Sequence, residues 1–270
     1  MSLSSPVGGV GGTQRHPVES NEKTAGQTGL VQFDGQHPVQ GLDGVGEKTT
    51  HILLSVPPSD QGDPVYNLMG EWISDLPNLQ WIGYLSTTGV YGNLNGEIAT
   101  EKTPCNPSGT RGERRMKAEL GWLGLHNSKG LPIHIFRLPG IYGPGRGPFS
   151  KVKNGTARRI IKKNQVFSRI HVDDIAQVLH ASINRPRSGA VYNVCDDYPA
   201  PPQDVIAHAA ELLDMPLPPV VKFEEAEMTP MARSFYAESK KVKNDLIKTE
   251  LGVSLRYRDY RQGLAALLKL

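Results

Sequence analysis

The sequence predicts an α/β fold, namely a doubly wound parallel sheet with a small, mostly helical C-terminal lobe. From residue 30 onward, short apolar runs alternate with segments of helical periodicity, which is the pattern of βαβ units. The apolar runs are almost uninterrupted, as in strands that helices cover on both faces. After residue 195, helical segments follow one another through Pro-rich or polar links, and this pattern predicts the separate lobe.

The first half of the chain gives the first three strands. Residues 30–33 form a strand that Asp34-Gly35 ends, and residues 51–55 form a strand that Pro57-Pro58 ends. A helix over 64–72 and a third strand over 79–85 follow. Residues 1–29 have no period of 2 or 3.6, so we expect a disordered tail there.

The second half continues the alternation. A helix is predicted over 108–126, because Met116, Leu120 and Leu123 recur at helical spacing. A strand over 132–138, a helix over 172–184 with Ile175 and Val178 on one side, and a strand over 190–194 complete the sheet. Three further helices are predicted over 203–213, 240–251 and 260–268. The domain limits are therefore 30–195 for the sheet domain, with 146–170 contributing to the second lobe, and 196–270 for the C-terminal lobe that holds the substrate.

Composition and charge exclude several classes of protein. The chain has 270 residues, 38% hydrophobic and 21% charged, and its net charge of +3 is too small for a nucleic-acid footprint. One basic cluster is better explained as a solvated or anion-facing surface than as a nucleic-acid site: Arg158, Arg159, Lys162 and Lys163. No apolar run reaches the roughly 18 residues of a membrane span. We therefore expect no nucleic-acid and no membrane partner.

The two cysteines indicate the compartment. Cys105 and Cys195 are far apart and belong to no CxxC pattern, so neither a metal site nor a disulfide framework is expected. A reducing environment fits this usage, and we expect an intracellular protein, cytoplasmic or organellar.

Two strand ends carry groups that can bind a ligand. The third strand runs into STTGVYG, which starts at Ser86, and the fourth runs from Phe136 into FRLPGIYGPG. Parallel sheets bind ligands outside the carboxyl ends of their strands, so Thr87 lies in the expected crevice. The alternative is that these hydroxyls only cap their own backbone.

These stretches, together with IHVDD from Ile170 and YNV from Tyr192, resemble the NAD-dependent epimerase/dehydratase family of the extended short-chain dehydrogenase/reductases. The motifs S-S/T-x-x-V-Y-G, R-x-x-x-x-Y-G-P-G, I-H-V-x-D and Y-N-V occur in the family's order, and the atypical, YeeZ-like subgroup is the most similar. The resemblance covers about residues 30–270. It implies a Rossmann-type fold, NAD or NADP as cofactor and a small hydroxyl or carbonyl substrate, and it leaves a homodimer open.

The family's catalytic groups are a Ser/Thr, a Tyr and a Lys, the last two four residues apart on one helix. The matching positions here are Thr87, Arg111 and Arg115. Arginine stays protonated and cannot shuttle a proton as the tyrosine does. Arg115 could still hold a ribose hydroxyl or phosphate, and Arg111 an anionic group of the substrate; the alternative is two exposed helix arginines. Substitute acid/base groups would be Tyr91, Tyr142 or His171.

The resemblance also assigns the binding residues. Cofactor contacts are expected at Ser55, Val56, Pro57, Thr87, Arg115, Leu138 and Pro139. Substrate contacts are expected at Tyr91, Arg169 and Arg233. Many sugar-nucleotide epimerases have an arginine four residues before the histidine of I-H-V; Phe167 stands there, which disfavours a nucleotide-diphosphate sugar.

One part of the family pattern is missing. The strand at 30–33 resembles the family's third strand, so the first βαβ unit, with its G-x-x-G-x-x-G turn, has no counterpart. Gly8–Gly12 is the only glycine cluster upstream, and it reads as flexible tail rather than as a phosphate loop, since no apolar strand precedes it. Either another segment or a partner fills the gap, or the chain is a truncated form of a longer protein, which we expect. Two functions follow: an NAD(P)-dependent enzyme, or a non-catalytic scaffold or assembly factor.

Overall fold

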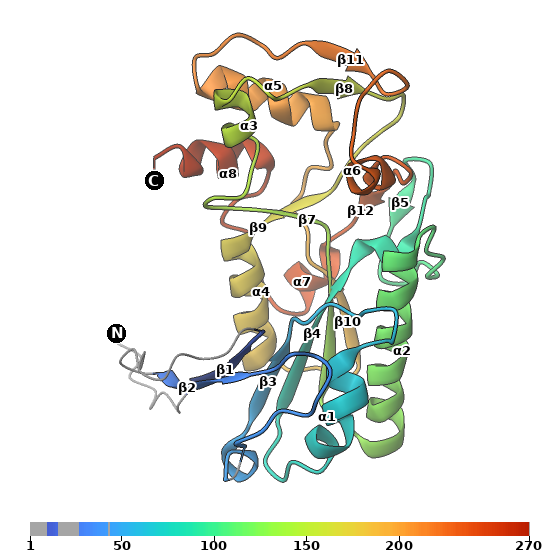
Figure 1. The fold of residues 1–270 in the computed structure, drawn as a ribbon, viewed down its shortest axis with the longest axis vertical. Coiled ribbons are helices and arrows are strands. Elements are labelled where there is room, and N and C mark those ends of the chain that lie inside the picture. The colour runs from blue at the N-terminus through green and yellow to red at the C-terminus, as the bar shows by residue number, and fades with distance from the viewer. Residues whose placement is uncertain (1–9, 16–26, 43, 270) are drawn as a thin grey trace.

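The computed structural model describes residues 10–15, 27–42 and 44–269 (Figure 1). Its central sheet has four parallel strands in the order β10-β6-β4-β3. They are β3 (His51–Leu54), β4 (Trp81–Thr87), β6 (Ile133–Leu138) and β10 (Ala190–Asn193). Because the strands are parallel, their carboxyl ends meet along one edge of the sheet.

Helices cover both faces of this sheet, as the sequence predicted (Figure 1). On one face lie α1 (Pro64–Ser74) and α2 (Thr110–Lys129), whose Trp122 packs with Ile82 of β4. On the other lies α4 (Val172–Asn184), whose Val178 packs with Phe136 of β6. The predicted apolar face of α2 is wrong in one respect. Leu120 is 63% exposed, and the buried face carries Ala118, Glu119 and Trp122.

A second lobe stands above the carboxyl ends of the strands (Figure 1). Its core joins α5 (Pro202–Leu212) and α8 (Tyr260–Leu267) to α3 (Phe149–Lys153). Its small sheets pair β8 (Arg159–Ile161) with β11 (Val220–Lys222), and β7 (Gly140–Tyr142) with β9 (Arg169–His171). The short helix α6 (Pro230–Phe235) lies between this lobe and α2.

The N-terminal segment differs from the prediction of a disordered tail. Val10–Gln14 form β1, which pairs in parallel with β2 (Gln27–Gln32) in a sheet of their own. A strand ladder is held by backbone hydrogen bonds, so it can form without a periodic side-chain pattern. Gly11 and Gly12 thus lie in a strand and not in a turn or tail; the rest of the tail prediction lies outside the described residues.

One predicted helix is wrong, and several boundaries shift. Residues 240–251 form β12 (Lys241–Val242), which pairs with β5 (Ile98–Ala99), followed by the short helix α7 (Asp245–Thr249). Tertiary pairing overrides helical propensity here, since Val242 is 4% exposed and donates its N–H to the Ser168 hydroxyl. In the described part of the chain, no helix combines the length and apolarity that crossing a bilayer requires.

Candidate functional site

A buried ion pair supports the carboxyl ends of β4 and β6. Arg137, at the end of β6, donates Nη2–H to Glu119 Oε2 at 2.7 Å, and its Nε lies 3.2 Å from both carboxylate oxygens. Glu119 projects from α2 and also accepts a very short hydrogen bond from the Ser86 hydroxyl. Arg137 and Glu119 are 6% and 2% exposed, so the pair ties α2 to two strands in the interior of the protein.

Tyr91 extends this network to β10. Its hydroxyl donates to Asn193 Oδ1 at 2.7 Å and accepts from Arg137 Nη1 at 2.9 Å. Tyr91 is 0% exposed, and burial raises its pKa to about 12. The substrate contact expected of Tyr91 does not fit this position, because both hydrogen-bonding directions of the hydroxyl are used inside the protein.

Thr87 lies at the upper end of β4, where the strand turns into the 3-10 helix η2 (Thr88–Tyr91). Its Oγ1 accepts the N–H of Gly89 at 3.1 Å, so the capping alternative is realised. The hydroxyl hydrogen is not used by that bond and can be donated to a ligand. Gly112 of α2 presses against the same turn, since a Cβ there would stand 2.6 Å from the Gly89 carbonyl oxygen.

The two arginines at the family's Tyr and Lys positions have different surroundings. Arg115 is half-buried and gives Nη1 to the Leu85 carbonyl at 2.6 Å and to the Tyr84 hydroxyl at 3.1 Å. Arg111 is exposed, and its guanidinium lies 5.3 Å from the ring centroid of Phe235. The helix therefore presents two fixed positive charges where the family has a proton-transfer pair.

The strand-end loops that we assigned to the cofactor are only partly open. Ser55 and Pro57 are exposed, and Val56 and Pro139 are half-buried. Leu138 is 6% exposed and belongs to the apolar core around α4, so its side chain does not fit the cofactor contact expected of it.

The other expected substrate residues lie in the second lobe, and among the described residues no hydrogen bond or ion pair joins them to Thr87. Arg169 donates Nη1–H to the carbonyl oxygens of Phe167 and Ala200, at 2.8 and 3.1 Å. Arg233 is exposed, donates to the Ala226 carbonyl at 2.8 Å and stands 5.0 Å from the ring centroid of Phe223.

The substitute acid/base candidates are buried. Tyr142 donates its hydroxyl to the Asp259 carbonyl at 3.3 Å, and burial raises its pKa. His171 is 1% exposed, burial lowers its pKa, and its Nδ1 caps α4 through the Asp173 N–H. Neither side chain is exposed to a ligand.

The basic cluster of the second lobe is largely occupied by its own backbone. Arg158 donates to the Gly155 and Ala157 carbonyls, and Arg159 to the Pro218 carbonyl. Lys162 donates a very short hydrogen bond to the Tyr236 carbonyl. These contacts agree with a structural role for the cluster.

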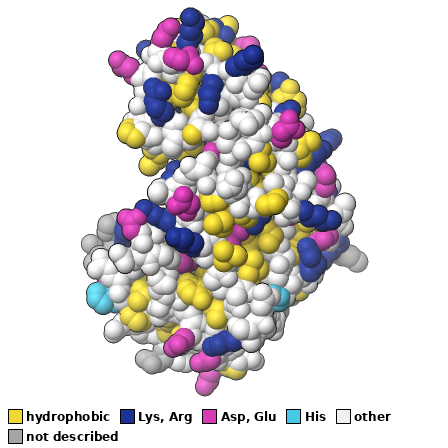
Figure 2. Space-filling model, turned by 90° about the vertical axis from the view of Figure 1, so that its right-hand side faces the viewer, with side chains coloured by type: hydrophobic (Ala, Val, Ile, Leu, Met, Phe, Trp, Pro, Cys, Tyr) yellow, Lys and Arg dark blue, Asp and Glu magenta, His cyan; other side chains and the backbone are white. Residues whose placement is uncertain are grey.

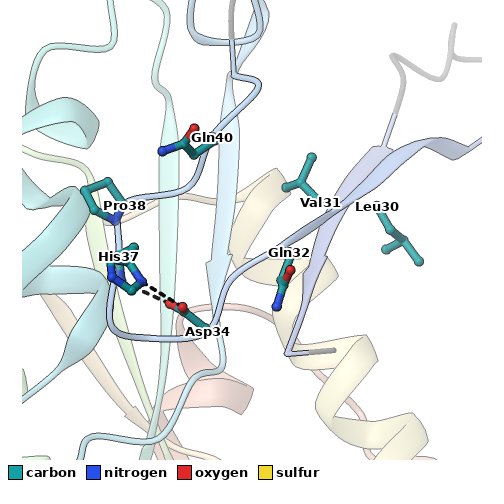
Figure 3. Close-up of a pocket in the computed structure, with 7 residues that line it drawn as sticks. All are labelled: Leu30, Val31, Gln32, Asp34, His37, Pro38 and Gln40. Atoms are coloured by element: carbon teal, nitrogen blue, oxygen red, sulfur yellow. Dashed lines mark hydrogen bonds and ion pairs between the residues drawn. The ribbon is translucent and has the colours of Figure 1, made fainter. Parts of the chain in front are cut away.

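A cavity of about 460 Å³ opens beside β2 (Figure 3). The loop after this strand lines it with Asp34 and His37, which are joined by a 2.8 Å hydrogen bond. The hydrogen bond from His37 and two backbone N–H groups lower the pKa of Asp34 to about 2. This pair was not predicted from the sequence, although a D-x-x-H spacing directly after a strand is the signal that could have indicated it.

The surface is indented between the two lobes, and Figure 2 shows Lys and Arg side chains along the lower side of this notch. The loops after β3, β4 and β6 reach the same edge of the sheet, below the second lobe. Fold and loops together define a Rossmann-type α/β protein, a class whose ligands bind at the carboxyl edge of the parallel sheet.

Comparison with known proteins identifies the family. The profile of the NAD dependent epimerase/dehydratase family matches residues 71–195. Protein YeeZ of Escherichia coli K12 is 34% identical over 113 residues, 42% of this chain, and the match spans only 38% of the length of that relative. A solved structure described as a functionally unknown conserved protein from Silicibacter pomeroyi DSS is 55% identical, with a TM-score of 0.80 over 89% of this chain and 82% of that one.

The fold is shared more widely. A dTDP-glucose 4,6-dehydratase from Bacillus anthracis, solved in complex with NAD, superposes with a TM-score of 0.74 at 19% identity, over 93% of this chain and 82% of that chain. The chain belongs to the NAD-dependent epimerase/dehydratase family of extended short-chain dehydrogenase/reductases, as the sequence motifs predicted.

Proposed function

We propose that this protein binds NAD or NADP and a small hydroxyl or carbonyl substrate at the carboxyl edge of its sheet. The observation that carries the proposal is the row of loops after β3, β4 and β6, which leaves Ser55, Pro57 and the Thr87 hydroxyl facing one edge. Thr87 would donate its hydrogen to the reacting oxygen of the substrate, and Arg115 would hold a ribose hydroxyl with the nitrogens that Leu85 leaves unused.

The residues present fit one half of such a cofactor better than the other. The exposed loop at Ser55–Pro57 and half-buried Pro139 can flank a nicotinamide ring and its ribose. The described glycines Gly11 and Gly12 lie in β1 and offer no turn of N–H groups for a pyrophosphate. We therefore expect weak binding, and the cofactor preference stays open.

Titration calorimetry with NADH and with NADPH tests this proposal. Both cofactors carry negatively charged phosphates, and a glutamate at exposed Pro57 would add a like charge to the edge assigned to them, so Pro57→Glu should weaken binding by more than about tenfold. Pro77→Glu is the matched control, because Pro77 is exposed at the opposite end of α1, beyond the amino end of β4. Absence of heat with both cofactors at millimolar concentration would rule out the proposal.

The alternative is a non-catalytic scaffold or assembly factor. It is favoured by the two arginines at the Tyr and Lys positions and by the burial of Tyr91, Tyr142 and His171. A stable partner recovered by affinity purification, with no turnover of hydroxyl or carbonyl compounds, would support it. Turnover by a monomer without a partner would contradict it.

A further inference from the structure

Arg111 is the unpaired charge among the arginines at the start of α2. Arg114 forms an ion pair with Asp60, and Arg115 is hydrogen-bonded to the Leu85 carbonyl. In the part of the chain that the structure describes, Arg111 has no carboxylate or carbonyl partner, and its guanidinium stacks on Phe235. The guanidinium group has five N–H donors, and those on its edge are free to bind a ligand.

Phe235 reaches Arg111 from the other lobe and is held there by the segment that follows it. Glu238 accepts a hydrogen bond from the hydroxyl of Ser108, just before α2, at 2.8 Å. Lys240, 8% exposed, donates to the Gly92 carbonyl at 2.7 Å. These bonds hold the segment that follows α6 beside the start of α2. Phe235 itself remains accessible, since the residue is 52% exposed.

The same helix end adjoins the proposed reaction site. Gly112, the residue after Arg111, packs on the Gly89 carbonyl. The N–H of the same Gly89 donates a hydrogen bond to Thr87 Oγ1. The helix turn that carries Arg111, with Phe235 stacked on it, thus begins next to the turn that Thr87 caps.

We propose that Arg111 and Phe235 form a recognition site for a small substrate that carries an oxyanion, a carboxylate or phosphate, next to a flat apolar group. The guanidinium would bind two anion oxygens side by side, while the exposed ring packs on the apolar part. An arginine at the position of the family's tyrosine then serves binding in place of proton transfer. The inference rests on the proposed function only in taking this edge as the substrate side.

Titration with three aromatic probes tests the site: benzoate, phenyl phosphate and neutral benzyl alcohol. We expect an anion to bind and benzyl alcohol not to bind. The ratio of the affinities for the two anions distinguishes carboxylate from phosphate recognition.

Arg111→Met should weaken anion binding at least about tenfold. Arg111→Lys should weaken it by less, since a lysine keeps the charge without the paired donors of the guanidinium. Phe235→Leu should weaken it by about threefold. Arg261→Met is the matched control, because Arg261 is an exposed arginine that stacks 4.8 Å from the Tyr198 centroid elsewhere in the second lobe, and it should change binding by less than about twofold.

Binding of NADH and of NADPH, measured on the same proteins, separates this inference from the proposed function. If the wild type binds an anion but neither cofactor, the proposed function is lost and the recognition site stands. The inference is overturned if neither anion binds the wild type, if benzyl alcohol binds as well as the tighter-binding anion, or if Arg111→Met binds that anion as the wild type does.

Discussion

The two halves of the sheet's carboxyl edge are built differently. Under β4, β6 and β10, the ends are joined by buried side chains, with Arg137 bonded to Glu119 and to Tyr91. At β3 the strand borders only β4 among the described strands, and its Leu53 is 49% exposed. The ends of β4, β6 and β10 are therefore held in place by buried hydrogen bonds, whereas the end of β3 depends on packing against one neighbouring strand.

Because of this difference, we expect the half joined by buried hydrogen bonds to bind its ligand more firmly than the half at β3. The supported half carries Thr87, and we assign it to the substrate together with Arg111 and Phe235. The open half carries Ser55 and Pro57, which we assign to the cofactor. Among the described residues, no further strand joins the sheet beside β3, since β1 and β2 form a separate sheet.

The largest effect is expected from breaking the buried ion pair. Arg137→Met would leave the Glu119 carboxylate, 2% exposed, without its counter-charge, and should lower the free energy of unfolding by about 3–5 kcal/mol. Urea unfolding measures it. The double variant with Glu119→Leu removes both charges and should recover most of the loss. A cost below about 1 kcal/mol for Arg137→Met would mean that the pair does not support the strand ends.

A second test compares neighbouring leucines on the open strand. Leu54 is 5% exposed and packs under α1, whereas Leu53 points to the other face and is 49% exposed. Leu54→Ala should cost about 2–4 kcal/mol, and Leu53→Ala less than about 1 kcal/mol, in the same unfolding experiment. Equal costs would show that something covers Leu53 in solution, and β3 would no longer be an open edge.

The third prediction concerns pH and the residues after β10. Burial raises the pKa of Asp196, 1% exposed, to about 8, from an ordinary value of 3.8. The unfolded chain loses this proton near pH 4 and the folded chain only near pH 8, so Asp196 destabilises the fold progressively across that window. Asp196→Asn lacks this dependence.

Thermal unfolding from pH 4 to pH 8.5 measures the effect. Relative to the wild type, Asp196→Asn should gain on the order of 1 kcal/mol or more as the pH rises through the window. The control is Asp204→Asn, which changes an exposed carboxylate on α5. A stability difference that stays constant with pH would show that Asp196 is ionised in the folded protein at neutral pH.

The sequence predicted those features that depend on local pattern. The helix over 172–184 was predicted with its observed bounds, because Ile175 and Val178 mark one buried face and polar residues the other. The helix over 240–251 was wrong, because Val242 is recruited into a parallel pair with Ala99, far away in the sequence. Local periodicity contains no information on such a partner.

The same limit applies to the site. Thr87 could be placed at a strand end from STTGVYG alone, and its cap on Gly89 was one of two open alternatives. The pairing of Glu119 with Arg137 could not be predicted, since the residues lie on different elements and α2 was oriented by Leu120, which is exposed. The burial of a glutamate on the face that also carries Trp122 can be explained only once the opposing strand is known to supply an arginine.

The smallest effect, and the one nearest the chemistry, is expected at Thr87. Thr87→Val keeps the shape but leaves the Gly89 N–H without its 3.1 Å acceptor, so unfolding should become easier by about 0.5–1.5 kcal/mol. Thr88→Val makes the same change one residue later. The Thr88 side chain is 7% exposed and its hydroxyl has no hydrogen-bond partner among the described residues, so this change should alter stability by less than about 0.5 kcal/mol.

Thr87→Ser keeps both the hydrogen bond to Gly89 and the hydroxyl donor. If Thr87 serves the substrate as well as the turn, turnover should survive Thr87→Ser and be lost in Thr87→Val, even under conditions where both variants are fully folded; equal turnover in the two would reduce Thr87 to a backbone cap.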